Sequence, residues 1–265
     1  MTELLAGISD PDEFRRLNQE HPHRYPFLLQ STARGGDLGQ FDILFCFPGE
    51  ALVLDSDGTL AGPNAESHTG FLAALDSWWE LECSTSSDNK LPFIGGWFVY
   101  LGYELAEEIE PRLQLKQDPL LPKAFAVRCP AAIVFNHKNN ECLFVSERNH
   151  SSLLKQVSAD IADLKPQHPR SNRPQLKINE DPPEQFTATV EAVKKHIEAG
   201  DVYQANLSRE WMVSVTDELS AEELYAALCK ANPGPFAGIV HWQGTVIISS
   251  SPERLLSIRD GEIST

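Results

Sequence analysis

The chain has 265 residues, of which 42% are hydrophobic and 23% charged, ordinary proportions for a globular protein that can bury a full core. Its formal net charge of −16 argues against nucleic acid and membrane partners, because both bind basic surfaces. Five scattered cysteines without a CxxC pair favour buried thiols in a reducing compartment, and no stretch approaches the roughly 18 apolar residues of a membrane span. We therefore expect a cytoplasmic protein.

The first 164 residues predict alternating helices and hairpins. Asp10 followed by Pro11 is typical of a helix start. Apolar residues at helical spacing predict helices over 70–81 and 151–164. The glycine-punctuated aromatic segment 91–103 predicts a central strand with close backbone packing, followed by a short acidic helix. Apolar runs bounded by turn residues predict strands over 25–31, 41–47, 51–54, 131–135 and 142–146.

Prolines mark a boundary in the second half of the chain. The segment 165–183 contains five prolines among polar residues and predicts a linker without regular structure. A helix is predicted over 183–199, because the apolar residues of this segment recur on one helical face. Gly200 is predicted to cap the C-terminus of that helix.

Beyond Gly200 the fold is predicted to continue as a mixture of strands and a helix. The expected elements are a strand over 203–215, a helix over 221–230, a hairpin of 236–242 with 245–250, and a strand from 255. This alternation lacks the strict βαβ rhythm of a doubly wound fold, so we predict the α+β class. The expected organisation is an N-terminal domain at 1–164, a linker at 165–183 and the start of a second domain at 184–265.

The first motif that could carry chemistry follows the predicted helix cap. It reads Gly200-Asp201-Val202-Tyr203-Gln204-Ala205-Asn206-Leu207. On a strand, Gln204 and Asn206 would share one face. Two neutral amides on one face suit the recognition of carboxylates and hydroxyls, which makes both residues candidates for substrate contact. The alternative is a helix cap followed by a polar strand face.

The second motif reads Ser250-Ser251-Pro252-Glu253-Arg254. Pro252 marks a strand end or a bulge, because proline cannot donate a hydrogen bond to a sheet ladder. Glu253 would then leave regular pairing, and a carboxyl group in a cleft can act as a general acid or base. The alternative is an edge-strand glutamate in a surface ion pair.

Both motifs resemble those of the chorismate-utilising enzymes, the family of anthranilate synthase component I and aminodeoxychorismate synthase component I. The resemblance extends to 25–42 and 92–103 and so covers essentially the whole chain. Asn206-Leu207 and the short spacing between Ser31 and Asp201 are more similar to the aminodeoxychorismate type. The resemblance implies antiparallel β-sheets in a sandwich flanked by helices, incomplete at the C-terminus.

The resemblance also implies a reaction. Chorismate and ammonia from a glutamine amidotransferase partner would give 4-amino-4-deoxychorismate, for p-aminobenzoate and folate biosynthesis, and Glu253 would be the general acid/base that helps the C4 hydroxyl leave. The family's lysine nucleophile and the glutamates that bind Mg²⁺ are expected beyond Thr265. We therefore expect no metal ligands here and no activity of this chain alone. The alternatives are anthranilate synthase component I, and a split gene whose second half is made separately.

A tryptophan-binding site is implied in the same way. The three segments that enclose tryptophan in the family correspond to candidates Ser31, Leu38, Gly39, Gln40, Phe41, Pro235, Phe236 and Ala237. An indole needs apolar and aromatic walls, and its amino and carboxylate groups need a hydroxyl, backbone N–H groups and an acid such as Asp42. The alternatives are that Phe41 and Phe236 are plain core residues, or that the chain is a non-catalytic tryptophan-binding or docking module.

Overall fold

The computed structural model describes residues 1–8, 10–33, 39–83, 91–165, 175–215, 219–259 and 261–264. These residues form two units, which are Met1–Pro166 with Ala221–Thr265 (unit 1) and Gln167–Ser220 (unit 2). Within the described ranges, no helix combines the length and the apolar composition that crossing a membrane requires.

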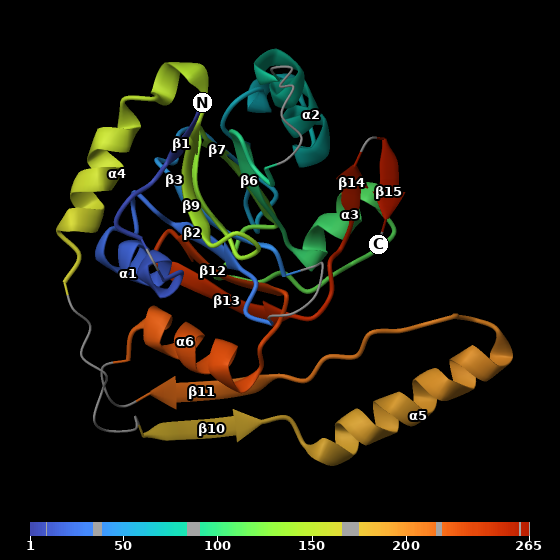
Figure 1. The fold of residues 1–265 in the computed structure, drawn as a ribbon. Helices are drawn as coiled ribbons and strands as arrows, with labels where there is room; N and C mark the ends of the chain where they lie inside the picture. The colour runs from blue at the N-terminus through green and yellow to red at the C-terminus, as the bar shows by residue number, and fades with distance from the viewer. Residues whose placement is uncertain are drawn as a thin grey trace. The chain divides into compact units, whose positions relative to one another are not determined.

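Unit 1 is built on a seven-stranded antiparallel sheet in which strands distant in sequence are neighbours. The order is β1 (Thr2–Leu4), β9 (Glu141–Ser146), β8 (Ala131–Asn136), β3 (Phe41–Cys46), β2 (Phe27–Gln30), β12 (Phe236–Trp242) and β13 (Thr245–Ser251). The predicted hairpins β8–β9 and β12–β13 are confirmed. The pairing of β12 with β2 joins a late segment of the chain to an early one, as Figure 1 shows.

A second antiparallel sheet packs against the first. Its order is β5 (Leu60–Ala61), β4 (Ala51–Leu54), β7 (Ala124–Cys129) and β6 (Gly96–Leu101). Aromatic rings fill the space between the sheets. Phe27 stacks on Phe98 with ring centroids 4.1 Å apart, and Phe125 stacks on Trp242 at 3.8 Å. The predicted sandwich of antiparallel sheets is therefore confirmed.

The strand predicted from the glycine-rich segment forms, but the prediction that it is central is wrong. Among the described strands β6 pairs with β7 alone, and its residues Val99 and Leu101 are 40% and 47% exposed. Gly95 makes room for a side chain rather than for a neighbouring strand, because a Cβ at this position would lie 2.5 Å from Glu147 Cγ.

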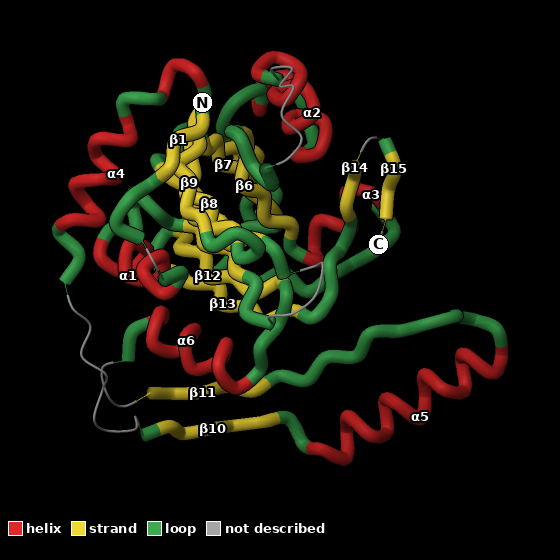
Figure 2. Tube along the Cα trace, in the orientation of Figure 1, coloured by secondary structure: helices red, strands yellow, loops and turns green. Residues whose placement is uncertain are grey.

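Helices cover the outer faces of the two sheets (Figure 2). α2 (Phe71–Glu82) covers the smaller sheet and buries Trp78 there. The seven-stranded sheet is covered by α1 (Asp12–Glu20), α4 (Leu153–Ala162) and α6 (Ala221–Ala231), which bury Phe14, Val157 and Tyr225 against its strands. The connections contain η1 (Ala65–Ser67), η2 (Tyr103–Leu105), α3 (Ala106–Ile109) and η3 (Arg148–His150). Each predicted helix of unit 1 is present, with its ends shifted by at most a few residues.

Unit 2 consists of α5 (Pro183–Ala199) and a hairpin of β10 (Leu176–Glu180) with β11 (Trp211–Val215). α5 has its predicted bounds, and Gly200 follows it in the left-handed region, at φ 80°, as a C-terminal cap requires.

Two predictions for unit 2 are wrong. The predicted linker contains β10, because the proline-free stretch 175–181 has apolar residues at alternate positions and pairs with β11. Residues 166–174 of the predicted linker lie outside the described ranges. The strand expected over 203–215 begins only at Trp211. A strand needs a hydrogen-bonded partner, and the β10 ladder ends opposite Trp211.

The two units divide the chain differently from the predicted boundaries at 1–164, 165–183 and 184–265. α6, β12 and β13 follow unit 2 in sequence but belong to unit 1, because β12 bonds to β2. The last strands, β14 (Ser257–Arg259) and β15 (Glu262–Ser264), form a further hairpin in unit 1, with Gly261 at φ 82° in its turn. The chain thus returns to unit 1 after completing unit 2.

Candidate functional site

The end of β2 lies between the starts of β3 and β12, because both of these strands run antiparallel to it. This arrangement brings together three segments, 30–32, 39–42 and 234–237, which we call the three-segment edge. Leu38, one of the predicted tryptophan-site residues, lies outside the described residues. Every other predicted residue of that site belongs to this edge.

Ser31, Phe41 and Phe236 lie on neighbouring segments of the edge. β2 pairs with β3 as far as Leu29 opposite Ile43 and with β12 as far as Gln30 opposite Ala237, and Ser31 follows directly. The Ser31 hydroxyl contacts the backbone of Phe41 and of Pro235, so Ser31 lies between the segments that carry the two phenylalanines. Phe41 and Phe236 lie two and four residues from Ile43 and Val240, which pack between the two sheets, so alternation along β3 and β12 turns both rings to that face. β2 lies between β3 and β12, and neighbouring strands lie about 4.8 Å apart. The two half-buried rings therefore start about 10 Å apart, with the Ser31 hydroxyl between them and Leu29, 38% exposed, on the same face.

Hydrogen bonds join the three segments around Ser31 and Thr32. The Ser31 hydroxyl lies 3.0 Å from the Pro235 carbonyl oxygen and 3.3 Å from that of Phe41, so it can donate to either. The Thr32 N–H donates to the Gly234 carbonyl at 2.9 Å, and the Gly234 N–H donates to Thr32 Oγ1 at 2.9 Å. These contacts fix the entry to β12 against the end of β2.

Asp42 is a buried carboxylate, 2% exposed, on the opposite face of the sheet from Phe41. It accepts hydrogen bonds from the Ser31 N–H at 2.8 Å, from Gln30 Nε2 at 3.1 Å and from His137 Nε2 at 2.9 Å. Asp42 therefore bonds to groups of the protein itself. This arrangement does not favour the hypothesis that Asp42 receives the amino group of a ligand.

Helix α6 supplies two further polar groups near this cluster, Tyr225 and Cys229. Burial raises the pKa of the Tyr225 hydroxyl and that of the Cys229 thiol. Both groups therefore stay protonated near neutral pH and add no charge beside Asp42.

The close approach of the segments explains why residue 39 is a glycine. It also involves two residues that the sequence did not single out, Thr32 and His137. A Cβ on Gly39 would lie 2.7 Å from the Ala33 carbonyl oxygen, so glycine is needed where the two segments cross. The Gln40 carbonyl accepts the His137 N–H at 2.9 Å. Thr32 and His137 were missed, because neither residue shows its contact in a local pattern; only the pairing of β3 with β8 brings His137 to the edge.

Glu253 lies in unit 1, immediately after β13. The strand ends at Ser251, directly before Pro252, as the sequence predicted. The chain then turns, with the Ser251 hydroxyl donating to the Glu253 carbonyl oxygen at 2.9 Å. The Glu253 side chain is exposed in this turn and free of strand pairing. Its assignment as a general acid/base stays a prediction.

Gln204 and Asn206 lie in unit 2, and the prediction that a strand aligns them on one face is wrong. Residues 204–210 have no regular structure, and both amide side chains are exposed. Because these residues are not in a strand, their spacing does not define a common face. Their role in substrate recognition stays a prediction.

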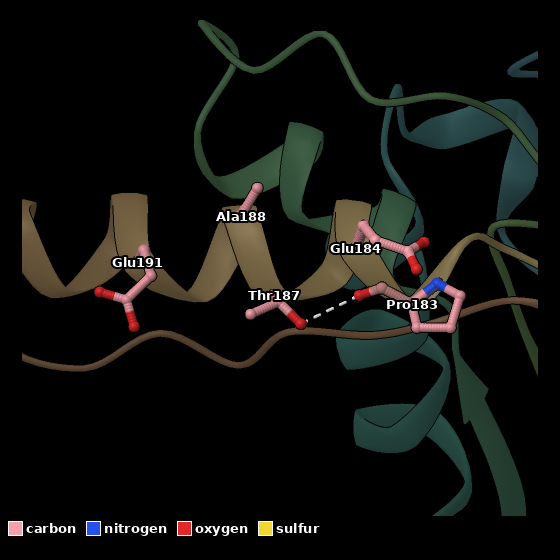
Figure 3. Close-up of a pocket in the computed structure, with 5 residues that line it drawn as sticks. All are labelled: Pro183, Glu184, Thr187, Ala188 and Glu191. Atoms are coloured by element: carbon pink, nitrogen blue, oxygen red, sulfur yellow. Dashed lines mark hydrogen bonds between the residues drawn. The ribbon is translucent and has the colours of Figure 1, made fainter.

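A shallow hollow on unit 2 contains none of the predicted site residues. It is lined by the first half of α5, at Pro183, Glu184, Thr187, Ala188 and Glu191 (Figure 3). Thr187 Oγ1 donates to the Pro183 carbonyl at 3.0 Å within the helix. The two glutamates give the hollow negative charge, which would repel a dicarboxylate such as chorismate.

The described residues do not provide a metal site. Within the described ranges, no three His, Cys, Asp or Glu side chains converge on one point. Mg²⁺ requires several oxygen ligands in near-octahedral geometry. The Mg²⁺ expected for the family enzyme therefore does not fit the residues described.

Comparison with known proteins places the fold and the motifs in one family. Residues 49–265 match the chorismate binding enzyme family. The chain is 30% identical to an anthranilate synthase component I-like protein of Synechocystis sp. over 99% of this chain and 59% of that protein. It is 30% identical to anthranilate synthase component 1 of Geobacillus stearothermophilus, over 98% of this chain and 56% of that one. Identity to the aminodeoxychorismate synthase of Streptomyces griseus is 25%, over 88% of this chain and 35% of that protein.

The solved structure of anthranilate synthase component I from Streptococcus pneumoniae has the same fold, with a TM-score of 0.65, 22% identity, and coverage of 87% of this chain and 54% of that chain. The chain belongs to the chorismate binding enzyme family. It spans about half the length of the curated relatives it matches.

Proposed function

We propose that the protein containing this chain aminates chorismate, using ammonia delivered by a glutamine amidotransferase partner. The observation that carries this proposal is the match of residues 49–265 to the chorismate binding enzyme family. The relatives named above as synthases of anthranilate or of aminodeoxychorismate support it.

The position of amination separates two candidate reactions. Asn206-Leu207 resembles the aminodeoxychorismate type, which would replace the C4 hydroxyl with an amino group and lead to p-aminobenzoate and folate. The relatives named anthranilate synthase component I reach 30% identity, against 25% for the aminodeoxychorismate synthase. Anthranilate synthase, in which ammonia adds at C2 and pyruvate is lost, is thus supported at least equally, and the product distinguishes the two reactions.

In either reaction a hydroxyl group must leave the chorismate ring, and a positioned acid assists by donating a proton to its oxygen. Glu253 has the required chemical group at an irregular turn outside strand pairing. We propose it as this acid. General acid catalysis contributes about 10²–10⁴-fold to a rate, so its loss would be measurable.

The test uses the product of the complete gene with chorismate, ammonium and Mg²⁺, analysed by chromatography with mass detection. We expect 4-amino-4-deoxychorismate or anthranilate in the wild type and a loss of kcat of about 10²-fold or more in Glu253→Gln, because an amide cannot transfer the proton. Glu262→Gln, at an exposed glutamate on β15, is the matched control and should keep its rate. If the wild type makes neither product, the proposal is wrong.

We further propose that the three-segment edge binds L-tryptophan. The observation that favours this function is the grouping of Phe41, Ser31 and Phe236, which offers two aromatic side chains with a hydroxyl between them. A flat indole fits the spacing of about 10 Å between the strands that carry the two rings, and stacking between aromatic groups is favourable. This function needs only residues of this chain, so it also covers the case of a non-catalytic tryptophan-binding module.

Calorimetric titration of the 265-residue chain with L-tryptophan tests the second proposal. We expect Ser31→Ala to weaken binding about tenfold, the value of one lost hydrogen bond. Ser158→Ala is the control, because the Ser158 hydroxyl bonds to the Leu154 carbonyl within α4. The absence of both binding heat and a thermal shift in the wild type would rule tryptophan binding out.

A further inference from the structure

His137 contacts the three-segment edge twice, although it lies far from the edge residues in sequence. It lies in the turn between β8 and β9, next to Asn136, which pairs with Phe41. Its backbone N–H donates to the Gln40 carbonyl at 2.9 Å, and its ring Nε2 lies 2.9 Å from Asp42 Oδ1. The ring is mostly buried, with 17% of the side chain exposed, so both contacts are sheltered from water.

Asp42 extends the contact from His137 to Ser31. The same oxygen, Oδ1, that faces the His137 ring also accepts the Ser31 backbone N–H at 2.8 Å. The other oxygen accepts Gln30 Nε2 at 3.1 Å. β2 ends at Gln30, so this carboxylate, rather than a neighbouring strand, holds the backbone N–H of Ser31.

We propose that His137 is a positioning residue of the three-segment edge, an inference that rests on the proposed tryptophan site. Its Nε2–H orients the Asp42 carboxylate, which in turn fixes the Ser31 backbone and so the direction of the Ser31 hydroxyl between Phe41 and Phe236. The role requires a hydrogen-bond donor at the place of Nε2. It does not require a positive charge, because the neutral Nε2–H tautomer and the imidazolium both donate there.

A purely stabilising role for His137 makes a different prediction. A residue that only contributes to folding would lower the unfolding temperature when it is replaced, while the folded protein would keep Ser31 protected and would bind tryptophan as before. A positioning residue changes both properties in the folded protein. A side chain that can still donate a hydrogen bond should restore them.

The experiment compares His137→Phe with His137→Gln in the 265-residue chain, at a temperature at which circular dichroism shows each variant folded. Phenylalanine can keep the ring contact with Phe135, at 5.1 Å between centroids, but has no donor; glutamine has a donor. Should His137→Phe not fold, His137→Leu replaces it. The control is His21→Leu, because the His21 ring also lies beside a buried carboxylate, 3.9 Å from Asp160.

The two readouts are the amide hydrogen exchange rate of Ser31, measured by NMR, and the Kd for L-tryptophan, measured by calorimetry. We expect His137→Phe to speed Ser31 exchange and to weaken tryptophan binding by about tenfold each, the effect of one hydrogen bond. His137→Gln should stay within about threefold of the wild type in both, since its amide can donate in place of Nε2–H. His21→Leu should change neither.

Ser31 exchange as slow in His137→Phe as in the wild type would overturn the proposal. So would faster exchange with unchanged tryptophan affinity, or a His137→Gln variant as impaired as His137→Phe. If the wild type does not bind tryptophan, the tryptophan proposal fails on its own. In that case the Ser31 exchange rates alone decide whether His137 positions this edge.

Discussion

Unit 1 and unit 2 differ in what covers their apolar side chains. In unit 1, Leu44 and Ile133 are fully buried between the seven-stranded sheet and its helices. In unit 2, no residue of α5 is buried and every residue of β10 and β11 is exposed, including Trp211 at 54%. An uncovered two-stranded hairpin is at best marginally stable. The three-segment edge therefore lies on a rigid framework, whereas Gln204 and Asn206 do not.

Amide hydrogen exchange should show the largest difference between the two units. The amides of β3 and β8 lie in paired inner strands of unit 1, and those of β10 and β11 lie in the exposed hairpin. We expect exchange in β10 and β11 to be at least about 1,000-fold faster, which corresponds to about 4 kcal/mol in opening free energy. Exchange followed by mass spectrometry on the 265-residue chain measures this ratio. Equal protection of the two units would contradict the comparison.

The second prediction concerns a buried carboxylate that stabilises unit 1. Asp160, 5% exposed, accepts hydrogen bonds from Arg24 Nη1 and from the Tyr25 hydroxyl, each at 2.5 Å. Burial alone raises the pKa of Asp160, but the hydrogen bonds from Tyr25 and Arg24 outweigh burial and lower this pKa below its ordinary 3.8. We expect Asp160→Asn to lower the free energy of unfolding by about 2–4 kcal/mol at pH 7.

The pH dependence follows from the direction of the pKa shift of Asp160. A carboxyl group with a lowered folded-state pKa stabilises the protein above its unfolded pKa, and this stabilisation is lost as pH falls through the folded-state pKa. The difference between the wild type and Asp160→Asn should therefore shrink below about pH 4. Urea unfolding at pH 7 and pH 3 measures it, with exposed Asp163→Asn as control. An equal difference at both pH values would refute the assignment.

How far the sequence predicts the fold depends on how local the determining interactions are. α5 was predicted with its observed ends, because helical spacing and the Gly200 cap are properties of neighbouring residues. β10 was not predicted, because the prolines on either side of it indicated a linker without regular structure. The strand expected from Tyr203 was predicted from alternation, but alternation cannot show whether a partner strand is present.

The same distinction applies to the candidate site. Resemblance to a family pointed to Ser31, Phe41 and Phe236 before any pairing was known, and the pairing of β2 with β3 and β12 brings their segments together at one edge. His137 could not be predicted, because its contact with Asp42 depends on the register of β8 against β3. Family resemblance thus pointed to the residues of the proposed tryptophan site, and only the fold showed that His137 contacts Asp42 beside them.

Two glycine substitutions are expected to have the smallest effect, and they test whether the entry to β12 is as tightly packed as the structure indicates. A Cβ at Gly234 would lie 2.8 Å from the Ser251 carbonyl oxygen, so Gly234→Ala must push two backbone segments apart. We expect a loss of about 1–2 kcal/mol, seen as a fall of about 2–6 °C in the Tm of unit 1 by calorimetry.

Gly200→Ala, at φ 80° with no atom within 4 Å of the added Cβ, strains only the end of α5. Because Gly200 belongs to unit 2, the substitution Gly200→Ala should leave the Tm of unit 1 unchanged. An equal fall in Tm in both variants would show that the two units unfold together.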